Sequence, residues 1–288
     1  MEELIEKYFE NIYTDKKNKV LHICNTAVNP GEEISLAMQL PEVLDLTPMY
    51  MPIKIKHGQK AGPCLLIIGS LHGDGFNGIE IINKVKLQSA ISKINGTLIC
   101  VPAINVFGMV NRSRVTVDHK VLNSIFPGAP DGTYSERLAE MFVKNIFDIA
   151  DICINIETGG KDHYNIPQVY TNFESEISSY IARSLKVNII SECDAKEGTL
   201  EKVAFERDKI FVTLKSGEAM RFDSKLISSG VKGIINVLRQ IGMIAKNRES
   251  GKTTDNLVFN TQGNEWVQAP KSGLCIGAKK LGEHVKKG

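Results

Sequence analysis

The segment that most constrains the fold of this chain is the apolar run GPCLLIIGSL at residues 62–71, which leads directly into HGDG. A continuous apolar run of this length is typical of a strand that is buried on both faces of a parallel sheet. The segment GIEIINKVKLQSAI at 78–91 has helical spacing, and GTLICVPAIN at 96–105 is a second strand-like run. Together the three segments predict a βαβ unit.

The alternation of strand-like and helix-like segments continues to about residue 244, after an irregular stretch at 105–133. Further elements are predicted as a helix at 135–150, a strand at 151–158, a helix at 174–187, a strand at 209–217 and a helix at 224–244. Ser135 is a suitable N-cap for the first of these helices. We therefore expect an α/β fold with a mainly parallel or mixed central sheet flanked by helices.

A polar stretch, AKNRESGKTTDN at 245–256, is the expected linker between two parts of the chain. We place the α/β domain at residues 1–247 and a small β module at 248–288, where the sequence alternates and turns like short antiparallel strands. If the sheet of this module is unfinished, unpaired backbone groups remain on its edge; the alternative is a short module that closes differently. An unfinished sheet favours a homo-oligomer or a partner chain that pairs with that edge.

Composition and charge limit the function. The 288 residues are 42% hydrophobic, and the formal net charge of +2 argues against a nucleic-acid or membrane-binding surface. No apolar stretch approaches the roughly 20 residues of a membrane span, and the acidic start MEELIEKYFENIY is unlike a signal peptide, so we expect a cytoplasmic protein. The six cysteines are widely spaced, and Cys64, Cys100 and Cys153 fall in strand-like runs, as buried reduced thiols do.

Polar residues follow the predicted strands at the points where the strands end. His72 and Asp74 follow the first strand, Asn105 the second and Glu157 the third, and Lys215 lies near the end of IFVTLK. Ligands of open α/β sheets bind at the carboxyl ends of the strands, so we expect these side chains to converge. Taken singly, each has an ordinary structural explanation, such as an Asx turn for the aspartate.

At these positions the chain resembles the succinylglutamate desuccinylase and aspartoacylase family of zinc-dependent deacylases, which are related in fold to zinc carboxypeptidases. GPCLLIIGSLHGDGFNGIE is similar to the family's strand-HGDE-loop-helix segment, and VPAINVFGMVNRSR with VLNSIFPG is similar to its stretch ending in Asp-Leu-Asn-Arg-x-Phe-Pro-Gly. DICINIETGG resembles its Leu-His-Thr-Gly-Gly strand end, and FVTLKSG resembles its Thr-Val-Glu-Leu-Gly stretch. The resemblance implies a zinc carboxypeptidase-like fold and hydrolysis of an acylated amino acid at a zinc ion.

The resemblance also shows where this chain departs from the family. His72 matches a zinc-binding histidine, but Gly75 stands at the position of the glutamate ligand and Glu157 at that of the second histidine. Lys215 stands at the position of the general base. A catalytic zinc needs three protein ligands and a water, so these exchanges affect both the metal and the base.

Part of the substrate-binding apparatus matches the family. Arg114 and Asn123 match residues that hold the substrate, with a catalytic role for the arginine, whereas Ser124 replaces the second arginine of the motif. His119, His163 and Tyr164 lie in loops near these segments, and we interpret them as ordinary loop residues at the surface. The alternatives are a replacement metal ligand for His119 and positions at the pocket mouth for His163 and Tyr164.

Three functions stay open. In the first, a Glu157–Lys215 ion pair fills the place of the metal, and the protein binds an acylated amino acid or a partner without conventional hydrolysis and without a cofactor. In the second, His72, Asp74 and Glu157 hold a divalent metal for deacylation, and these oxygen-rich ligands suit manganese, magnesium or iron better than zinc. In the third, the open β edge of the C-terminal module matters more than the pocket. The first depends on Glu157 and Lys215 facing each other rather than pointing into solvent.

Overall fold

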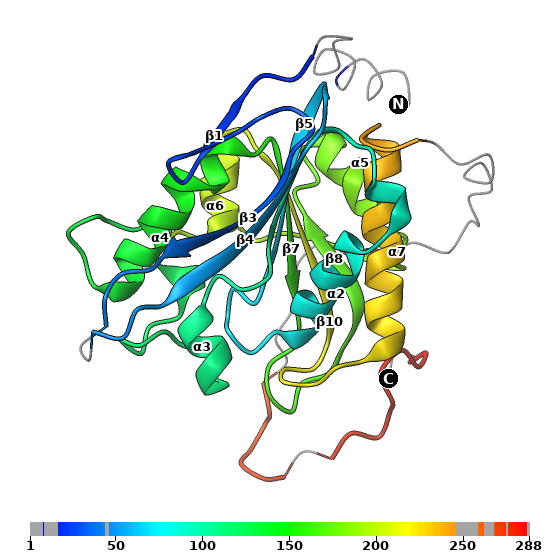
Figure 1. Cartoon of the computed structure of the whole chain (residues 1–288). Helices are drawn as coiled ribbons and strands as arrows, with labels where there is room; N and C mark the ends of the chain where they lie inside the picture. The colour runs from blue at the N-terminus through cyan, green and yellow to red at the C-terminus, as the bar shows by residue number, and fades with distance from the viewer. Residues whose placement is uncertain are drawn as a thin grey trace.

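The computed structural model describes residues 8, 17–43, 46–245, 259–261, 268–274 and 276–286. Within these residues the main sheet has nine strands in the order β11-β9-β8-β10-β7-β5-β6-β4-β3, and β1 pairs with β2 in a separate ribbon. The strands are β1 Leu21–Ile23, β2 Thr26–Val28, β3 Glu33–Gln39, β4 Tyr50–His57, β5 Lys60–Gly69, β6 Asn95–Val101, β7 Ile152–Glu157, β8 Asn165–Thr171, β9 Ile189–Glu192, β10 Ile210–Gly217 and β11 Phe259–Thr261. Figure 1 shows the sheet between two layers of helices.

The centre of the sheet is parallel and its flanks are mixed. β10, β7, β5 and β6 run parallel to one another, whereas β8, β4 and β3 each join a neighbour in antiparallel fashion. The predicted βαβ unit is confirmed, because β5 and β6 are parallel neighbours joined through a helix. Leu65 and Ile67 of β5 pack in one core cluster and Leu66 and Ile68 in the other, so this strand is buried on both faces as its sequence predicts.

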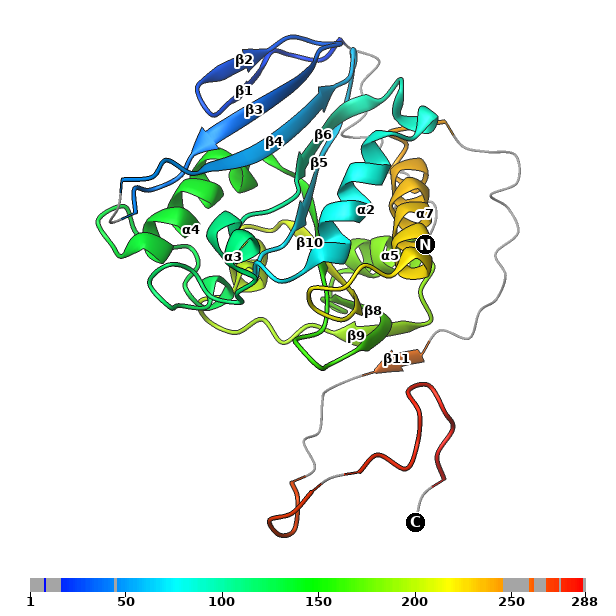
Figure 2. The same ribbon diagram turned by 60° about the horizontal axis from the view of Figure 1, so that its bottom comes forward.

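Helices cover both faces of the sheet. They are α2 Phe76–Lys86, α3 Val106–Asn111, α4 Tyr134–Asn145, α5 Glu176–Ser184, α6 Leu200–Glu206 and α7 Ser224–Gln240, with short 3-10 turns at Ser89–Ile91, Leu122–Ser124 and Phe147–Ile149. α2, α5 and α7 contribute to one core cluster, and α4 and α6 to the other. Figure 2 shows α2 and α7 on one side of the sheet and α4 on the opposite side.

Some sequence expectations need correction. The N-cap of α4 is Thr133, which forms a capping box with Glu136, whereas Ser135 lies inside the helix and its backbone N–H donates to Asp118. The reciprocal bonds of the box satisfy two free N–H groups at once, so the preceding threonine is the stronger cap. The stretch 105–133 contains the short helix α3, and β8, β9 and α6 have too little periodicity to be predicted.

The C-terminal part differs from the expected β module. β11 pairs in parallel with β9 and so extends the main sheet. The described residues 268–274 and 276–286 contain no strand, so the short antiparallel strands expected there are not found in them. Most of the expected linker, residues 246–256, and Cys275 lie outside the described residues. The division at residue 247 stays a prediction.

The sequence also led to expectations about the cysteines and about membrane spans. Cys64, Cys100 and Cys153 are buried free thiols, as predicted. Among the described residues, no helix combines the length and the apolar character that a membrane crossing requires.

Candidate functional site

The side chains expected at the site converge because β10, β7 and β5 are neighbours in the sheet. Lys215 of β10 is the direct register partner of Glu157, the last residue of β7. The loop after β5 then brings His72 and Asp74 to the same edge, where they line one small cavity with Glu157. That cavity has a volume of about 10 Å³, which is space for about one water molecule or ion.

Glu157 is the centre of this cluster. Its carboxylate is buried and lies 3.4 Å from His72 Nε2 and 3.5 Å from Lys215 Nζ. Asn155 Nδ2 donates to Glu157 Oε1 at 3.0 Å. Burial by itself raises the pKa of the Glu157 carboxyl, but the two basic neighbours and the hydrogen bond outweigh burial and hold the pKa below its ordinary value. The carboxylate is therefore ionised at neutral pH and paired with Lys215.

Lys215 is the residue at the family's general-base position, and its surroundings suit a cation. The ammonium lies 5.1 Å from the centre of the Tyr170 ring, within the range of a cation–π contact. The side chain is 29% exposed, so the ammonium borders both the buried carboxylate and solvent. The expected Glu157–Lys215 pair therefore forms, and the alternative in which the two side chains point apart into solvent is wrong.

His72 is buried, and burial lowers the pKa of its imidazole, with Arg114 and Lys215 contributing in the same direction against Glu157 and Asp74. The ring is neutral at pH 7. Its Nδ1 is buried and has no hydrogen-bond partner in the described structure. An unpartnered ring nitrogen beside a cavity is a natural contact point for a ligand or an ion.

Asp74 pairs with the guanidinium of Arg114, whereas a metal site would need its carboxylate to face the ion. Arg114 Nη1 lies 3.4 Å from both carboxylate oxygens of Asp74. Asp74 is buried, whereas 42% of the arginine side chain is exposed, so the guanidinium reaches the rim of the site. This geometry orients Arg114 and leaves part of its donor fork free for a carboxylate ligand.

Asn123 and Ser124 turn away from this cluster. Asn123 Oδ1 accepts from the Leu200 N–H at 2.9 Å, and its Nδ2 donates to Glu201 at 3.1 Å. The exposed Ser124 hydroxyl donates to the carbonyl of Val121 at 2.8 Å. In this conformation these two predicted substrate-binding residues hold the start of α6 and a loop turn, and their substrate roles stay predictions.

A buried polar chain beneath the site was not predicted from the sequence. Asn155 Nδ2 lies 3.4 Å from Thr213 Oγ1, which lies 3.5 Å from Glu201 Oε1, and Asn123 reaches Glu201 from the other side. Burial, reinforced by the negative charge of Glu157, raises the pKa of Glu201. One sequence feature could have indicated this row of buried polar side chains. Asn155 is a polar residue in the otherwise apolar run ICIN of a strand that is buried on both faces.

The loop histidines and the nearby tyrosine lie at the surface, which matches the first interpretation given to them. His119 and His163 are exposed, and His163 Nδ1 bonds only to the carbonyl of Lys161 among the described residues. Tyr164 is 42% exposed, and its hydroxyl donates to Asp223. These residues supply no ligand to the Glu157 cluster.

The residues present fit a catalytic zinc ion poorly. Gly75 supplies no donor atom, and a Lys215 ammonium stands 3.5 Å from the carboxylate at the second histidine position. Among the described residues, no group of three or more histidine, cysteine, aspartate or glutamate side chains is arranged to hold a metal. Packing does not explain the exchange at position 75, because a Cβ there would meet nothing closer than 3.8 Å and the φ of −85° suits any residue.

The mixed sheet, its two layers of helices and the strand-end cluster define an α/β protein with a candidate site at the carboxyl edge of its sheet. A sequence model of the succinylglutamate desuccinylase/aspartoacylase catalytic domain matches residues 61–241, so the chain belongs to this family.

The chain is similar to a protein named as a deacetylase and to a solved structure of the same family. It is 24% identical over 244 residues to the N-alpha-acetyl-L-2,4-diaminobutyric acid deacetylase of Halomonas elongata, a match that covers 81% of this chain and 70% of that protein. A succinylglutamate desuccinylase/aspartoacylase structure from Rhodobacter sphaeroides superposes with a TM-score of 0.79 at 22% identity and covers 92% of this chain and 84% of that one.

Two further structures confirm the fold. The product-bound ectoine utilization protein EutE (DoeB) of Ruegeria pomeroyi gives a TM-score of 0.71 at 22% identity, over 81% of this chain and 73% of that chain. A metallo-carboxypeptidase of Burkholderia cenocepacia gives 0.57 at 13% identity, over 72% and 64%. The expected zinc carboxypeptidase-like fold is therefore confirmed.

Proposed function

We propose that this protein binds an N-acyl amino acid at the carboxyl edge of its sheet and does not hydrolyse it by the zinc-dependent route of its family. The observation that carries this proposal is the Lys215 ammonium, 3.5 Å from the buried Glu157 carboxylate. A fixed ammonium repels a divalent cation and does not accept a proton from water. By the family resemblance, the two residues of the pair stand at the positions of the second histidine ligand and the general base.

The cations at the rim explain how such a ligand is bound. Arg114 is oriented by Asp74 and partly exposed, so its guanidinium is available to the carboxylate of the amino acid. The partly exposed Lys215 ammonium is a second donor for an acyl carbonyl or carboxylate. His72 lines the small cavity beside Glu157, and its buried Nδ1, which has no partner in the described structure, is a further acceptor.

A second candidate function is a metal-dependent deacylase of the amide or ester bond in an N-acyl amino acid. The comparisons favour this function over binding alone, because the family model describes a catalytic domain and the Halomonas elongata relative is named as a deacetylase. Its candidate ligands His72, Asp74 and Glu157 line one cavity, although in this conformation they are not arranged to hold a metal. The donor set argues against zinc, and these three residues are the ones that would hold any other divalent metal.

Binding and hydrolysis are separated by one set of experiments on the full chain. Calorimetric titration with a panel of N-acetyl and N-succinyl amino acids measures binding, and chromatography of the same mixtures, with and without added Zn²⁺, Mn²⁺, Mg²⁺ or Fe²⁺, measures cleavage. We expect saturable binding without cleavage. Cleavage that needs one of these metals and is lost in His72→Ala would establish the deacylase instead.

A matched pair of variants tests the role of the rim arginine. Arg114→Lys removes the planar fork beside Asp74, whereas Arg112→Lys makes the same chemical change at an exposed position of the same loop. We expect roughly tenfold weaker binding in the first variant and no change in the second. The cytoplasmic location and assembly through the C-terminal edge, expected from the sequence, stay predictions.

A further inference from the structure

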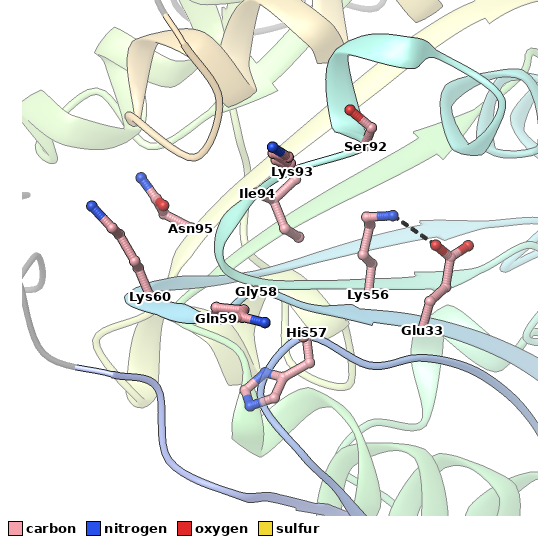
Figure 3. A pocket seen from close by; sticks show the side chains of 11 residues that line it. Glu33, Lys56, His57, Gly58, Gln59, Lys60, Ser92, Lys93, Ile94 and Asn95 are labelled. Atoms are coloured by element: carbon pink, nitrogen blue, oxygen red, sulfur yellow. Dashed lines mark hydrogen bonds and ion pairs between the residues drawn. The ribbon is translucent and has the colours of Figure 1, made fainter.

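A second cavity lies at the opposite edge of the sheet from the Glu157 cluster. It has a volume of about 570 Å³ and is formed by the turn between β4 and β5, the loop that leads into β6 and the start of β3. Figure 3 shows the side chains that line it. Its size falls within the range of small-molecule binding sites, roughly 300–1,000 Å³.

Positive charge exceeds negative charge around this cavity. Lys56, Lys60 and Lys93 line it, and Glu33 is the one carboxylate among its described lining residues. Lys56 Nζ lies 2.6 Å from Glu33, so these two charges offset each other. Neither Lys60 nor Lys93 forms an ion pair with any residue in the described part of the chain. Two ammonium groups therefore face the same hollow without a carboxylate partner.

Neighbouring lysines extend the positive field. Lys54 lies two residues before Lys56 on β4 and so points to the same face of the sheet. Burial lowers the pKa of Lys86, and the charge of Lys54 acts in the same direction. Repulsion among these groups makes a bound anion favourable, since it neutralises charges that the protein leaves uncompensated.

The walls of the cavity combine neutral donors with a fixed backbone. Gln59 and Asn95 line the hollow, and amide N–H groups donate hydrogen bonds to anions. Asn95 Nδ2 already donates to the carbonyl of Gly242 at 3.4 Å, so one of its two N–H groups is left for a ligand. His57 Nε2 donates to the carbonyl of Lys19 at 2.7 Å, and its Nδ1 lies 2.9 Å from Thr97 Oγ1. The ring is thereby fully engaged and holds the β4–β5 turn in place beneath the lysines.

We propose that this cavity is a binding site for a small polyanion that carries two or more phosphate or carboxylate groups, held by Lys60 and Lys93. The site is separate from the Glu157 cluster, because Lys60 begins β5 whereas His72 follows its end. Ten residues of strand separate the two edges by about 30 Å. The proposal is therefore independent of the function assigned to the carboxyl edge.

Isothermal titration of the full chain with pyrophosphate and with citrate tests the site, and the uncharged disaccharide sucrose is the negative control. We expect saturable binding of at least one polyanion at one site per chain and none of sucrose. Tighter binding of pyrophosphate assigns a phosphorylated ligand, and tighter binding of citrate assigns a polycarboxylate. The absence of saturable binding by both polyanions would overturn the proposal.

A pair of double variants places the bound anion. Lys60→Ala/Lys93→Ala removes both unpartnered ammonium groups, whereas Lys225→Ala/Lys232→Ala removes the same charge from the exposed face of α7. We expect binding to weaken roughly tenfold or more in the first variant and by less than about twofold in the second. Equal weakening in both would show binding to net charge alone and would contradict the site. Circular dichroism checks that both variants are folded.

Discussion

The two edges of the central sheet differ in whether their cationic side chains have carboxylate partners. At the carboxyl edge, Lys215 and Arg114 each lie beside a buried carboxylate, Glu157 or Asp74. At the opposite edge, Lys60 and Lys93 face a cavity without a carboxylate partner among the described residues. Paired buried charges are costly to separate, whereas exposed unpaired charges contribute little to folding and attract anions. Substitutions at the first edge should therefore change stability, and substitutions at the second should change binding alone.

The largest expected effect comes from breaking the carboxyl-edge cluster at its centre. Glu157→Gln removes the charge that pairs with Lys215 and leaves a partly buried ammonium without a counter-ion. We expect the free energy of unfolding to fall by roughly 2–3 kcal/mol, below the full cost of a buried pair because Lys215 is partly hydrated. Urea denaturation measures it. Glu80→Gln, in the partly exposed Glu80–Lys84 pair of α2, is the control and should change stability by less than about 0.5 kcal/mol. Equal losses of unfolding free energy in the two variants would mean that the Glu157–Lys215 pair stabilises the fold no more than the Glu80–Lys84 pair.

Removing the other member of the ion pair, Lys215, should also destabilise the fold, but by less. Lys215→Met keeps most of the aliphatic stem but removes the ammonium from Glu157 and from the Tyr170 ring. Because His72 and Asn155 still contact the carboxylate, we expect a loss of about 1–2 kcal/mol in urea denaturation. The pKa of Glu157 should also rise, which a carboxyl carbon NMR titration would detect. An unchanged titration would show that the ammonium is not the partner of this carboxylate.

A smaller effect is expected where hydrogen bonds hold the loop that carries Arg114. The backbone N–H of Ser135 and the hydroxyls of Ser135 and Thr116 donate to the Asp118 carboxylate. Burial opposes this ionisation, but the hydrogen bonds prevail and lower the pKa of Asp118 from 3.8 to about 2. Because the folded pKa is the lower one, the stabilisation is complete above the unfolded value of 3.8 and is lost as the pH falls through about 2.

Asp118→Asn tests this contribution. The aspartate is partly exposed, so we expect solvent screening to reduce its effect to about 1 kcal/mol of unfolding free energy at pH 7. The difference between the native chain and the variant should shrink between pH 4 and pH 2, as urea titrations at several pH values would record. A difference that grows on acidification would have the wrong sign for this account.

The smallest effect is expected at the basic cavity. Lys60→Ala/Lys93→Ala removes two exposed ammonium groups that have no ion pair in the described structure. The unfolding free energy should change by less than about 0.5 kcal/mol in either direction. Thermal denaturation in buffer without polyanions measures it. A loss of 2 kcal/mol or so would show that these lysines are structural, and the contrast between the two edges would fail.

Local sequence patterns were sufficient for the centre of the fold. The apolar runs of β5, β6 and β7 and the helical spacing of α2 and α7 are strong signals because these elements are long and bury continuous apolar surface. The shorter β9 and α6 have no comparable periodicity and depend on tertiary packing. The N-cap of α4 was misplaced by two residues, since Thr133 and Ser135 have similar capping strength and lie only two positions apart.

At the Glu157 cluster and the basic cavity, too, local sequence signals predicted some features, whereas others depend on tertiary packing. Glu157 and Lys215 were predicted to meet because each lies near a strand end, and parallel strands carry their ends to one edge. The chain from Asn155 through Thr213 to Glu201 depends on contacts between β7, β10 and α6, which no local pattern reports. The basic cavity combines residues from the ends of β3 to β6 and the turns between them, and each of these residues is ordinary in its own segment.

The central claim is that the Lys215 ammonium opposite Glu157 stands in place of the family's metal. Zinc content after equilibrium dialysis, measured by inductively coupled plasma mass spectrometry, tests it most directly on the native chain and on Gly75→Glu/Glu157→His/Lys215→Glu. Position 75 has room for the added side chain. The account predicts far less than one zinc per native chain and close to one per variant chain. A native chain that retains one zinc, and loses it in His72→Ala, would contradict the account.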